Sequence, residues 1–296
     1  MTQPAKAQPS ILILLPVHNR RATTALFLRS LLAQNWTNWH LLLIDDGSSD
    51  GTAEMVREQV SALTVIRGKG DWWWGGALHQ GYRWLRRHPE HHGDLVLIIN
   101  DDTEFAPDFL NTAIGAIRPR SLMLAQLYNQ AGEYVEAGVR WDWRSLNWAA
   151  TKETTGLNCF STRGLFLWAR DFLEIGGFHP VLLPHYLSDY EFTMRAHRKG
   201  FSLVSSPEVF LRYNEHLTGT RDHVEQGVLR YLKRLLSTKA ASNPVYWTSF
   251  ILIACPLRHM PRNIVIVWWN FVAPMFPPRV WQVLAWMRGK RRVRNP

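Results

Sequence analysis

Short apolar runs alternate with amphipathic segments along the first hundred residues of the chain. Runs of strand length lie at residues 11–16, 40–45, 63–66 and 95–100. Between them, apolar side chains recur at helical spacing in residues 21–34, 50–62 and 75–88. Continuous apolar strands that alternate with helices are typical of a parallel sheet with helices on both faces. The pattern therefore predicts an α/β fold built on a mostly parallel, Rossmann-like sheet flanked by helices.

Two segments in the second half of the chain extend this pattern. Residues 163–178 predict a strand, a short helix and a glycine turn, and residues 188–200 predict a further helix. Ser188 and Glu191 have the spacing of a capping box at the start of that helix. This spacing predicts that Asp189 occupies the first helical position, where the helix dipole and the free N–H groups keep a carboxylate ionised.

Polar clusters follow three of the predicted strands. They read PVHNR after the first strand, DDGSSDGT after the second and NDDT after the fourth. Because parallel sheets bind their ligands at the carboxyl ends of the strands, we expect these clusters to form one site. The turn after the first strand has no glycine, and the chain has no Gly-Lys-Ser/Thr loop. A dehydrogenase with a dinucleotide fold and a P-loop ATPase are therefore disfavoured.

Asp101 and Asp102 place two adjacent carboxylates at the end of an apolar strand. Carboxylate oxygens on a rigid strand end are good ligands for Mg²⁺ or Mn²⁺. Such ions commonly bind through one or two carboxylates together with the phosphates of a substrate. The NDDT cluster therefore indicates a metal that bridges a diphosphate. A helix-capping turn before residues 106–110 is the structural alternative.

The segment at residues 67–81, RGKGDWWWGGALHQG, combines glycines, tryptophans and basic side chains. Its glycines let the backbone approach a ligand, and Gly75 and Gly76 open a helix whose N-terminus would face a phosphate. The run Trp72–Trp74 offers a flat apolar wall to a sugar. Three consecutive tryptophans cannot all point the same way, so we expect at least one of them to belong to the core.

Basic and apolar residues gather in the last part of the chain. The net charge is +10, and residues 226–296 hold 12 Lys and Arg with no Asp or Glu. Apolar runs at 245–257 and 264–278 are shorter than the roughly 20 residues that span a bilayer. Tryptophans recur in this region, at Trp247, Trp268, Trp269, Trp281 and Trp286. Tryptophan beside Lys and Arg suits the lipid headgroup zone, so residues 237–296 are predicted to bind an anionic membrane surface. The alternative is a helical subdomain packed on the body, and no nucleic acid is expected as a partner.

The two cysteines, Cys159 and Cys255, make no disulfide framework, which indicates a reducing compartment. Residues 1–10 are polar, and the apolar run that follows them is too short for a signal peptide. We therefore expect a cytoplasmic protein that lies peripherally on the inner face of the cell membrane.

Five segments in order resemble a glycosyltransferase of family 2 with the GT-A fold. They are ILLPVHNR, LLLIDDGSSDGT, NDDTEFAPDFL, GLFLWARDFLEIGGF and LPHYLSDYEFTMRAHRKGF, and the resemblance runs from about residue 10 to residue 216. GKGDWWWGGALHQG and LPHYLSDYEF look most like the bacterial rhamnosyltransferase-like branch, which builds surface polysaccharides such as lipopolysaccharide. The implied domains are a GT-A domain at 1–236, with a nucleotide-sugar half at about 10–120 and an acceptor half at about 121–236, followed by the C-terminal segment at 237–296.

The resemblance implies roles for particular residues. Together with the 67–81 segment, it implies nucleotide contacts from Pro16, Val17, His18, Asn19, Asp46, Lys69, Gly70, Gly76 and Asp101. It implies sugar contacts from Trp73, Trp74, Arg163 and Gly164, and metal contacts from Asp102 and His216. Asp189 stands in the family's acidic motif as the catalytic base, although this chain has Ser-Asp where the family often has Glu-Asp. The structural alternatives are turn chemistry for Asp46, stabilisation of the helix N-terminus for Asp189 and a surface-loop role for His216.

The implied reaction is a direct displacement at the anomeric carbon with inversion, dependent on Mn²⁺ or Mg²⁺. The donor would be a dTDP- or UDP-sugar, with dTDP-rhamnose as one candidate, and the acceptor a hydroxyl of a lipid-linked or polysaccharide molecule. A metal-dependent nucleotidyltransferase is one alternative, although it would want a basic, glycine-rich loop directly after the first strand. A non-catalytic carbohydrate-binding relative is the other, although the presence of Asp46, Asp102 and Asp189 argues against it.

Overall fold

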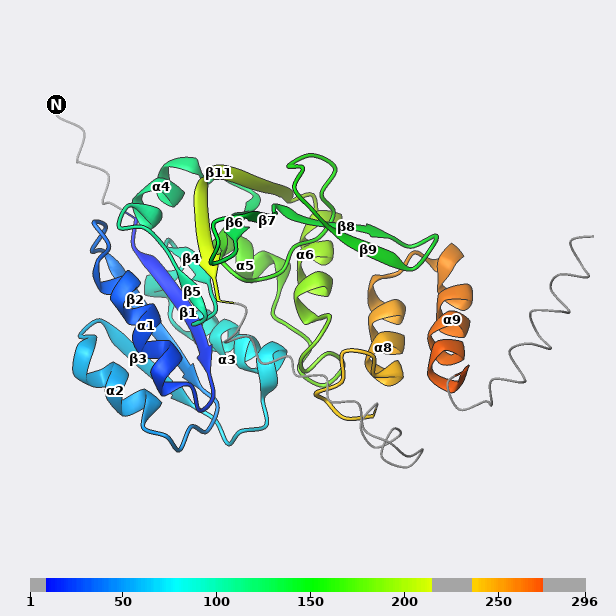
Figure 1. Cartoon of the computed structure of the whole chain (residues 1–296), viewed down its shortest axis with the longest axis horizontal. Coiled ribbons are helices and arrows are strands. Elements are labelled where there is room, and N and C mark those ends of the chain that lie inside the picture. Colours follow the sequence, from blue (N-terminus) through cyan, green and yellow to red (C-terminus); the bar gives the residue numbers. More distant parts are fainter. Residues whose placement is uncertain (1–8, 215–235, 274–296) are drawn as a thin grey trace, which may run out of the picture. The chain divides into compact units, whose positions relative to one another are not determined.

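The computed structural model describes residues 9–214 and 236–273 of the chain (Figure 1). The chain divides into two compact units, Met1–Arg221 and Asp222–Pro296. The first unit holds all of the described strands, and two helices make up most of the described part of the second. The predicted domain boundary at residue 236 stays a prediction.

The first half of the large unit is the predicted parallel sheet. Its strands are β1 (Ile11–Val17), β2 (Trp39–Asp45), β3 (Leu63–Arg67) and β4 (Leu95–Ile98), in the order β3-β2-β1-β4 with every pair parallel. The connecting helices are α1 (Arg21–Leu32), α2 (Thr52–Gln59) and α3 (Trp73–Arg87), and a single turn, η1 (Pro89–His91), precedes β4. The alternation read from the sequence is confirmed.

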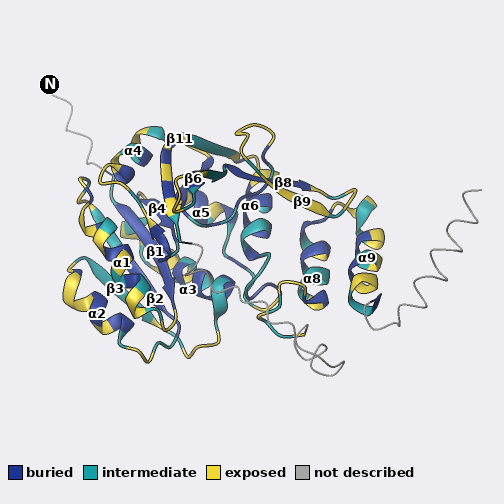
Figure 2. Cartoon of the chain, viewed as in Figure 1, coloured by how far each residue is buried: buried dark blue, intermediate teal, exposed yellow. Residues whose placement is uncertain are grey.

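The sheet separates two apolar cores (Figure 2). Successive side chains of a strand point to opposite faces, so Ile13 of β1 joins one core and Leu14 joins the other. The helices α1, α2 and α4 (Phe109–Ala116) contribute to the first core. The helices α3, α5 (Ala169–Ile175) and α6 (Ser188–Arg198) contribute to the second. Burial on both faces explains why these strands are apolar throughout.

Beyond β4 the sheet becomes mixed. β10 (Leu165–Trp168) lies antiparallel between β4 and β6 (Ser121–Tyr128), and β11 (Ser202–Tyr213) runs parallel to β6. Two short strands, β5 (Thr103–Glu104) and β7 (Tyr134–Glu136), add to β11 and β6. A separate hairpin is formed by β8 (Gly138–Asp142) and β9 (Asn147–Thr151). The predicted strand, helix and glycine turn of residues 163–178 correspond to β10, α5 and Gly176, whose φ is +93°.

The described part of the second unit is a helical pair. α8 (Pro244–Ala254) begins after Asn243, whose side chain accepts hydrogen bonds from the N–H groups of Val245 and Tyr246. A single turn, η3 (Leu257–His259), leads into α9 (Met260–Val272), and Trp268 Nε1 donates to Thr248 Oγ1 at 3.0 Å, so that α9 is tied to α8. In the parts of the chain that the structure describes, no helix combines the length and apolarity needed to cross a bilayer.

Candidate active site

The turns after β1 and β2 are joined by hydrogen bonds. Pro16 and Val17 end β1 beside Ile44 and Asp45 of β2, and the N–H of Asp46 donates to the Val17 carbonyl at 2.9 Å. His18 Nδ1 lies 2.5 Å from the Asp46 carbonyl oxygen, which fixes the ring proton on that nitrogen.

Asn19 links the turn after β1 to the turn after β2 by hydrogen bonds. Its φ is +51°, a left-handed conformation that asparagine tolerates better than most residues. Its Oδ1 accepts a hydrogen bond from the N–H of Ser49 at 2.8 Å, and its own N–H donates to Ser48 Oγ at 2.9 Å. The predicted nucleotide-side residues of the first two turns therefore form one hydrogen-bonded group.

The carboxylate of Asp46 is held by the backbone of the loop after β3. The N–H of Gly70 donates to Oδ1 at 2.8 Å, while the N–H groups of Trp72 and Trp73 donate to Oδ2 at 2.8 and 3.1 Å. The loop fits only because Gly68 has no side chain, since a Cβ there would lie 2.5 Å from Asp46 Oδ1. Lys69 is exposed on the same loop. Asp46 thus orders the loop that was predicted to contact the nucleotide.

Asp101 and Asp102 are neighbours in sequence and are both buried, but they have different partners. Arg20 Nε lies 2.7 and 2.9 Å from the two carboxylate oxygens of Asp101, and Thr24 Oγ1 donates to Oδ2 at 2.9 Å. Burial raises the pKa of Asp101, and Arg20 opposes that rise. Both oxygens of Asp101 are therefore hydrogen-bonded to Arg20, which precedes α1, or to Thr24 of α1.

Asp102 keeps one carboxylate oxygen without a hydrogen-bond donor. Its Oδ2 lies 3.5 Å from Arg163 Nη2, whereas Oδ1 is buried and has no partner among the described residues. The Oδ1 of Asn100, two residues after the end of β4, is also buried and has no hydrogen-bond partner among the described residues. Because an unpaired buried oxygen costs free energy, these two oxygens have the chemistry that fits a cationic ligand.

Arg163 lies between acidic and aromatic groups. Its guanidinium carbon lies 4.9 Å from the centre of the Tyr213 ring, and its charge opposes the effect of burial on Glu136, whose pKa is raised. Gly164 serves the packing of the sheet. Its φ is +82°, and a Cβ there would lie 2.5 Å from Leu211.

Asp189 receives hydrogen bonds from two other segments of the chain. Trp74 Nε1 donates to Oδ1 at 2.8 Å, and the N–H of Thr162 donates to Oδ2 at 3.3 Å. Burial raises the pKa of Asp189, and the hydrogen bonds from Thr162, Trp74 and Ser188 oppose that rise. A carboxylate with a raised pKa is a stronger base than an ordinary aspartate, provided that it is ionised.

The capping box predicted at the start of α6 is wrong. Leu187 is the N-cap and no side chain caps the helix, because Ser188 Oγ donates to the carbonyl of His185 at 2.6 Å instead. Glu191 makes a bidentate pair with Arg195, whose Nε and Nη2 lie 2.9 and 3.0 Å from its oxygens. Asp189 lies in the first turn of the helix, at its second residue and not at the predicted first position. Burial raises its pKa, which contradicts the prediction that the helix N-terminus keeps the carboxylate ionised.

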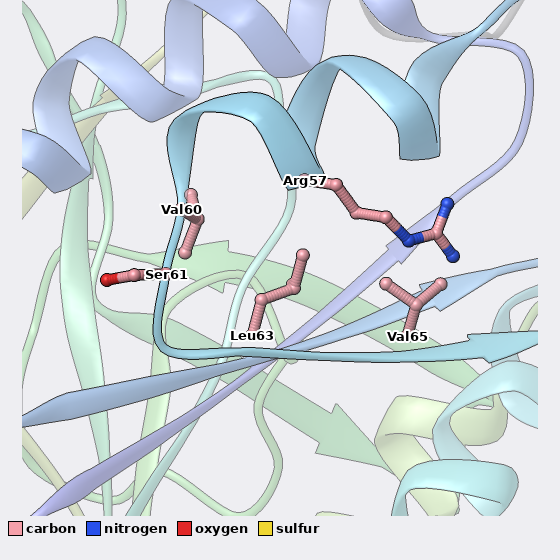
Figure 3. Close-up of a pocket in the computed structure, with 5 residues that line it drawn as sticks. All are labelled: Arg57, Val60, Ser61, Leu63 and Val65. Atoms are coloured by element: carbon pink, nitrogen blue, oxygen red, sulfur yellow. The ribbon is translucent and has the colours of Figure 1, made fainter.

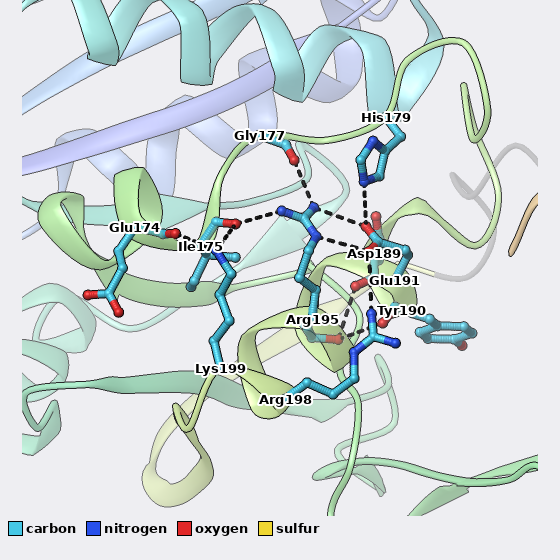
Figure 4. Close-up of polar contacts among 11 residues, drawn as sticks. Glu174, Ile175, Gly177, His179, Asp189, Tyr190, Glu191, Arg195, Arg198 and Lys199 are labelled. Carbon is cyan, nitrogen blue, oxygen red and sulfur yellow. Dashed lines mark hydrogen bonds and ion pairs between the residues drawn. The ribbon is translucent and has the colours of Figure 1, made fainter. Parts of the chain in front are cut away.

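The Glu191–Arg195 pair fixes the loop that leads into α6 (Figure 4). Arg195 donates to the carbonyls of Ile175 and Gly177, each at 2.7 Å. Lys199 Nζ donates to the carbonyl of Glu174 at 2.7 Å. These contacts tie the end of α5 to α6 and so help to position the helix that carries Asp189.

The three consecutive tryptophans do not share one environment. Trp72 and Trp74 pack against the second core, and Trp73, with φ of +57°, lies 5.6 Å from the ring of His185. The N–H of Gly75 donates to the Pro184 carbonyl at 2.8 Å, and Gly76 is buried near Trp72 and Pro180. α3 begins at Trp73 and not at Gly75 as predicted, and its start is packed against the segment before α6. The N–H of Gly75 is therefore not free for the predicted phosphate contact.

Glu136 and His185 are polar residues in this region that sequence reasoning did not select. Glu136 ends β7, and burial lowers the pKa of His185 to about 4. His185 stood within the LPHYLSDYEF segment quoted for the resemblance, so its place was signalled. Glu136 had no such signal, because its strand is only three residues long.

The structure has a hollow away from the acids, and it has no preformed metal-binding cluster among the described residues. A hollow between α2 and β3 lies near the starts of β2 and β3, away from the strand ends that carry the acids (Figure 3). Its lining residues are Arg57, Val60, Ser61, Leu63 and Val65. No group of three or more His, Cys, Asp and Glu side chains within residues 9–214 and 236–273 is arranged to hold a metal. The predicted ligand His216 lies outside the described residues.

Comparison with known proteins gives the class. The family model described as glycosyl transferase family 2 matches residues 12–170. Polyprenol monophosphomannose synthase of Mycolicibacterium smegmatis is 28% identical over 224 residues, which are 70% of this chain and 80% of that protein. A mannosyltransferase from Pyrobaculum calidifontis, solved with GDP-Man and Mn²⁺, has a TM-score of 0.50 at 16% identity, over 97% of this chain and 83% of that one.

A further solved structure, S. aureus TarS 1-349 in complex with UDP-GlcNAc, has a TM-score of 0.55 at 16% identity and covers 89% of this chain and 73% of its own. At these identities the structural matches establish the fold alone, which is that of GT-A glycosyltransferases. The chain belongs to glycosyltransferase family 2, because the family model covers more than half of its length. By that membership the protein is a glycosyltransferase.

Proposed function

We propose that this protein transfers a sugar, with inversion, from a nucleoside-diphosphate donor to a hydroxyl of a lipid-linked or saccharide acceptor. The observation that carries the proposal is the set of three acids, Asp46, Asp102 and Asp189, each of which is hydrogen-bonded or buried. Asp46 orders the loop at residues 68–73 for the nucleotide, and Asp102 serves the diphosphate end. Asp189 accepts the proton of the acceptor hydroxyl.

A divalent cation fits the residues at the end of β4. Asp102 Oδ1 and Asn100 Oδ1 are buried oxygens without a donor among the described residues, and hard cations prefer oxygen ligands. Because Asp101 is occupied by Arg20 and Thr24, the protein would supply few ligands and the donor diphosphate would supply others. When bound, Mn²⁺ or Mg²⁺ would neutralise charge on the leaving diphosphate. We propose Asp102 as its ligand, with His216 as a second ligand from the resemblance.

Two features support the proposed nature of the donor and acceptor. The GKGDWWWGGALHQG and LPHYLSDYEF segments favour the rhamnosyltransferase-like branch, and hence dTDP-rhamnose as a candidate donor among dTDP- and UDP-sugars. The relative from Mycolicibacterium smegmatis is named as a polyprenol monophosphomannose synthase, which supports an acceptor carried on a lipid.

The experiment that tests the reaction is a donor screen. Purified protein would be incubated with dTDP-rhamnose, UDP-sugars and GDP-mannose, and released nucleoside diphosphate would be measured with Mn²⁺, with Mg²⁺ and with chelator. We expect release from one donor class, lost in chelator and in Asp102→Ala. Release of pyrophosphate from a nucleoside triphosphate and a sugar phosphate would support a nucleotidyltransferase, and no turnover of any donor would support a non-catalytic relative.

We also propose that the second unit binds the anionic inner face of a membrane, where a lipid-linked acceptor would be presented. Exposed apolar side chains lie on its helices and on the turn between them, with Leu257 and Val265 exposed by 83% and 67%. Arg258 and Arg262 are exposed on the same stretch of chain. Each basic residue near an anionic leaflet contributes about 1 kcal/mol, and buried apolar side chains add attraction that salt does not screen.

Liposome flotation tests this membrane proposal. Binding should rise with the fraction of anionic lipid and fall only partly in high salt. Leu257→Asp and Val265→Asp should reduce the salt-resistant part, whereas Leu32→Asp, at a 49% exposed position of α1, should not. If the unmodified protein ignores anionic liposomes, the second unit is better explained as a packed subdomain.

A further inference from the structure

Trp74 connects the start of α3 to the proposed catalytic base. Its Nε1 lies 2.8 Å from Asp189 Oδ1 and 3.0 Å from Thr162 Oγ1, so one indole proton is shared between two acceptors. The side chain also packs against the second core, which holds the ring in place. Trp74 and Asp189 are 115 residues apart in sequence, so the contact depends on the assembled fold.

The two oxygens of Asp189 are held unequally. Oδ1 accepts from Trp74 Nε1 at 2.8 Å and from Ser188 Oγ at 3.3 Å. Oδ2 accepts from the N–H of Thr162 at 3.3 Å, a long hydrogen bond. The Thr162 hydroxyl also hydrogen-bonds to the carboxylate and lowers its pKa. Because the shortest of the printed hydrogen bonds is made to Oδ1, Oδ2 is the oxygen assigned to accept a new proton.

We propose that Trp74 is a positioning residue for the transfer reaction, which holds Asp189 through Oδ1 and leaves Oδ2 to take the proton of the acceptor hydroxyl. The inference rests on the proposed function of Asp189 as the base. In that step the acceptor oxygen forms a bond to the anomeric carbon and its proton moves to Oδ2. The bond from the anomeric carbon to the diphosphate breaks, and its electron pair stays on the diphosphate.

This role differs from the sugar contact that the sequence suggested for Trp74. An indole that stacks on a sugar presents its face, and its removal weakens the binding of the donor or acceptor. An indole that donates a hydrogen bond to a carboxylate stabilises the ionised form, and its removal disfavours ionisation. The two roles therefore predict different changes in KM, kcat and pH dependence.

Trp74→Phe separates these roles, because it removes the N–H and keeps an aromatic ring. With the donor found in the screen, we expect kcat to fall about tenfold and the acidic limb of the kcat profile to move up by about one pH unit. The dissociation constant of the nucleoside diphosphate should stay within about twofold of the unmodified protein. A rise in donor KM with an unchanged kcat and pH profile would overturn the positioning role and restore the sugar contact.

Trp168→Phe is the matched control. Trp168 ends β10 beside Leu95, the first residue of β4, so it lies at the strand end opposite Asp101 and Asp102. Its buried Nε1 has no hydrogen-bond partner among the described residues, so the substitution removes an indole N–H of the same kind without breaking a hydrogen bond. We expect it to leave kcat and the pH profile unchanged.

A second measurement needs no turnover. Protein labelled with ¹⁵N-tryptophan gives an indole signal for Trp74, identified by its loss in Trp74→Phe. That signal should shift with pH as Asp189 titrates, and the shift should vanish in Asp189→Asn. A Trp74 signal that ignores pH, or that shifts equally in Asp189→Asn, would overturn the contact.

Further variants separate the inference from the function on which it rests. If Asp189→Asn keeps full turnover, the base assignment fails whatever Trp74 does. If Asp189→Asn is inactive while Trp74→Phe is normal in kcat and pH profile, only the positioning role fails. Should Trp74→Phe not fold, Thr162→Val must raise the acidic limb and Thr162→Ser must restore it; an unchanged limb in Thr162→Val overturns the proposal.

Discussion

The pockets of Asp46 and Asp189 hold their carboxylates in different ways. Asp46 is bound by backbone N–H groups from a single loop, at residues 70, 72 and 73. Asp189 is bound by an indole N–H from α3, a backbone N–H before β10 and a neighbouring hydroxyl. A backbone-built pocket tolerates changes of side chain but depends on glycine, whereas a pocket built from side chains can be tuned by single substitutions. The first suits a fixed binding task, and the second suits a group whose basicity matters.

The largest effect is expected at Asp189. Asp189→Asn keeps the shape of the side chain and removes the base, so kcat should fall by roughly 10²–10⁴-fold. The dissociation constant of the nucleoside diphosphate, measured by calorimetry, should change little. Turnover equal to that of the unmodified protein would reduce Asp189 to a structural residue at the start of α6.

Asp46→Asn should act on binding instead of on the chemical step. The amide group would place N–H donors against the N–H groups of Gly70 or Trp72, and the loop would lose its anchor. We expect the nucleoside diphosphate to bind about 10–100-fold more weakly, which corresponds to about 1.4–2.7 kcal/mol. Calorimetric titration checks this, and unchanged affinity would remove Asp46 and its loop from the nucleotide site.

Gly68→Ala tests the dependence of the Asp46 pocket on glycine. The added Cβ would lie 2.5 Å from Asp46 Oδ1 and 2.8 Å from the ring of Trp72, so we expect a loss of about 1–3 kcal/mol in the free energy of unfolding. Gly93→Ala is the control, because no atom lies within 4 Å of the Cβ position there. Chemical denaturation of both variants measures the difference, and equal stabilities would mean that the loop adapts freely.

The smallest effect is a shift in pH dependence. Burial raises the pKa of Asp189 above its ordinary value of 3.8, and the base must be ionised to act. Activity should therefore fall as the pH drops, through a midpoint above 3.8. The sign for stability is the opposite, because the folded state binds this proton more tightly than the unfolded chain. The contribution of Asp189 to stability is present below the unfolded pKa and is lost as pH rises through the folded one. A kcat/KM profile whose acidic limb lies below pH 3.8 would contradict this.

The parallel half of the fold was predictable for two reasons. Its strands are buried on both faces and so are apolar throughout, and the apolar side chains of its helices recur with a period of 3.6 residues. The mixed half was not, since β5 and β7 are only two and three residues long, and β5 joins the sheet through β11, about 100 residues away. The acids of the candidate site could be selected from the sequence because they follow apolar strands or stand in an ordered motif.

The partners of those acids were hidden from the sequence. Arg20 and Asp101 are 81 residues apart, and Trp74 and Asp189 are 115 residues apart. The capping box failed for a local reason, because Glu191 found a bidentate partner in Arg195 one turn further along α6. A bidentate pair with Arg195 gives Glu191 two charge-assisted hydrogen bonds, whereas a capping box would have given it one.

The most direct test of the account is a calorimetric titration of a nucleoside diphosphate into the protein with Mn²⁺ and with chelator, repeated with Asp102→Ala. The account predicts binding that requires Mn²⁺ and is lost in Asp102→Ala, because the cation would satisfy the unpaired Oδ1 of Asp102. Asp189→Asn should bind as the unmodified protein does. Equal binding in chelator, or undiminished metal-dependent binding in Asp102→Ala, would contradict the proposed site at the end of β4.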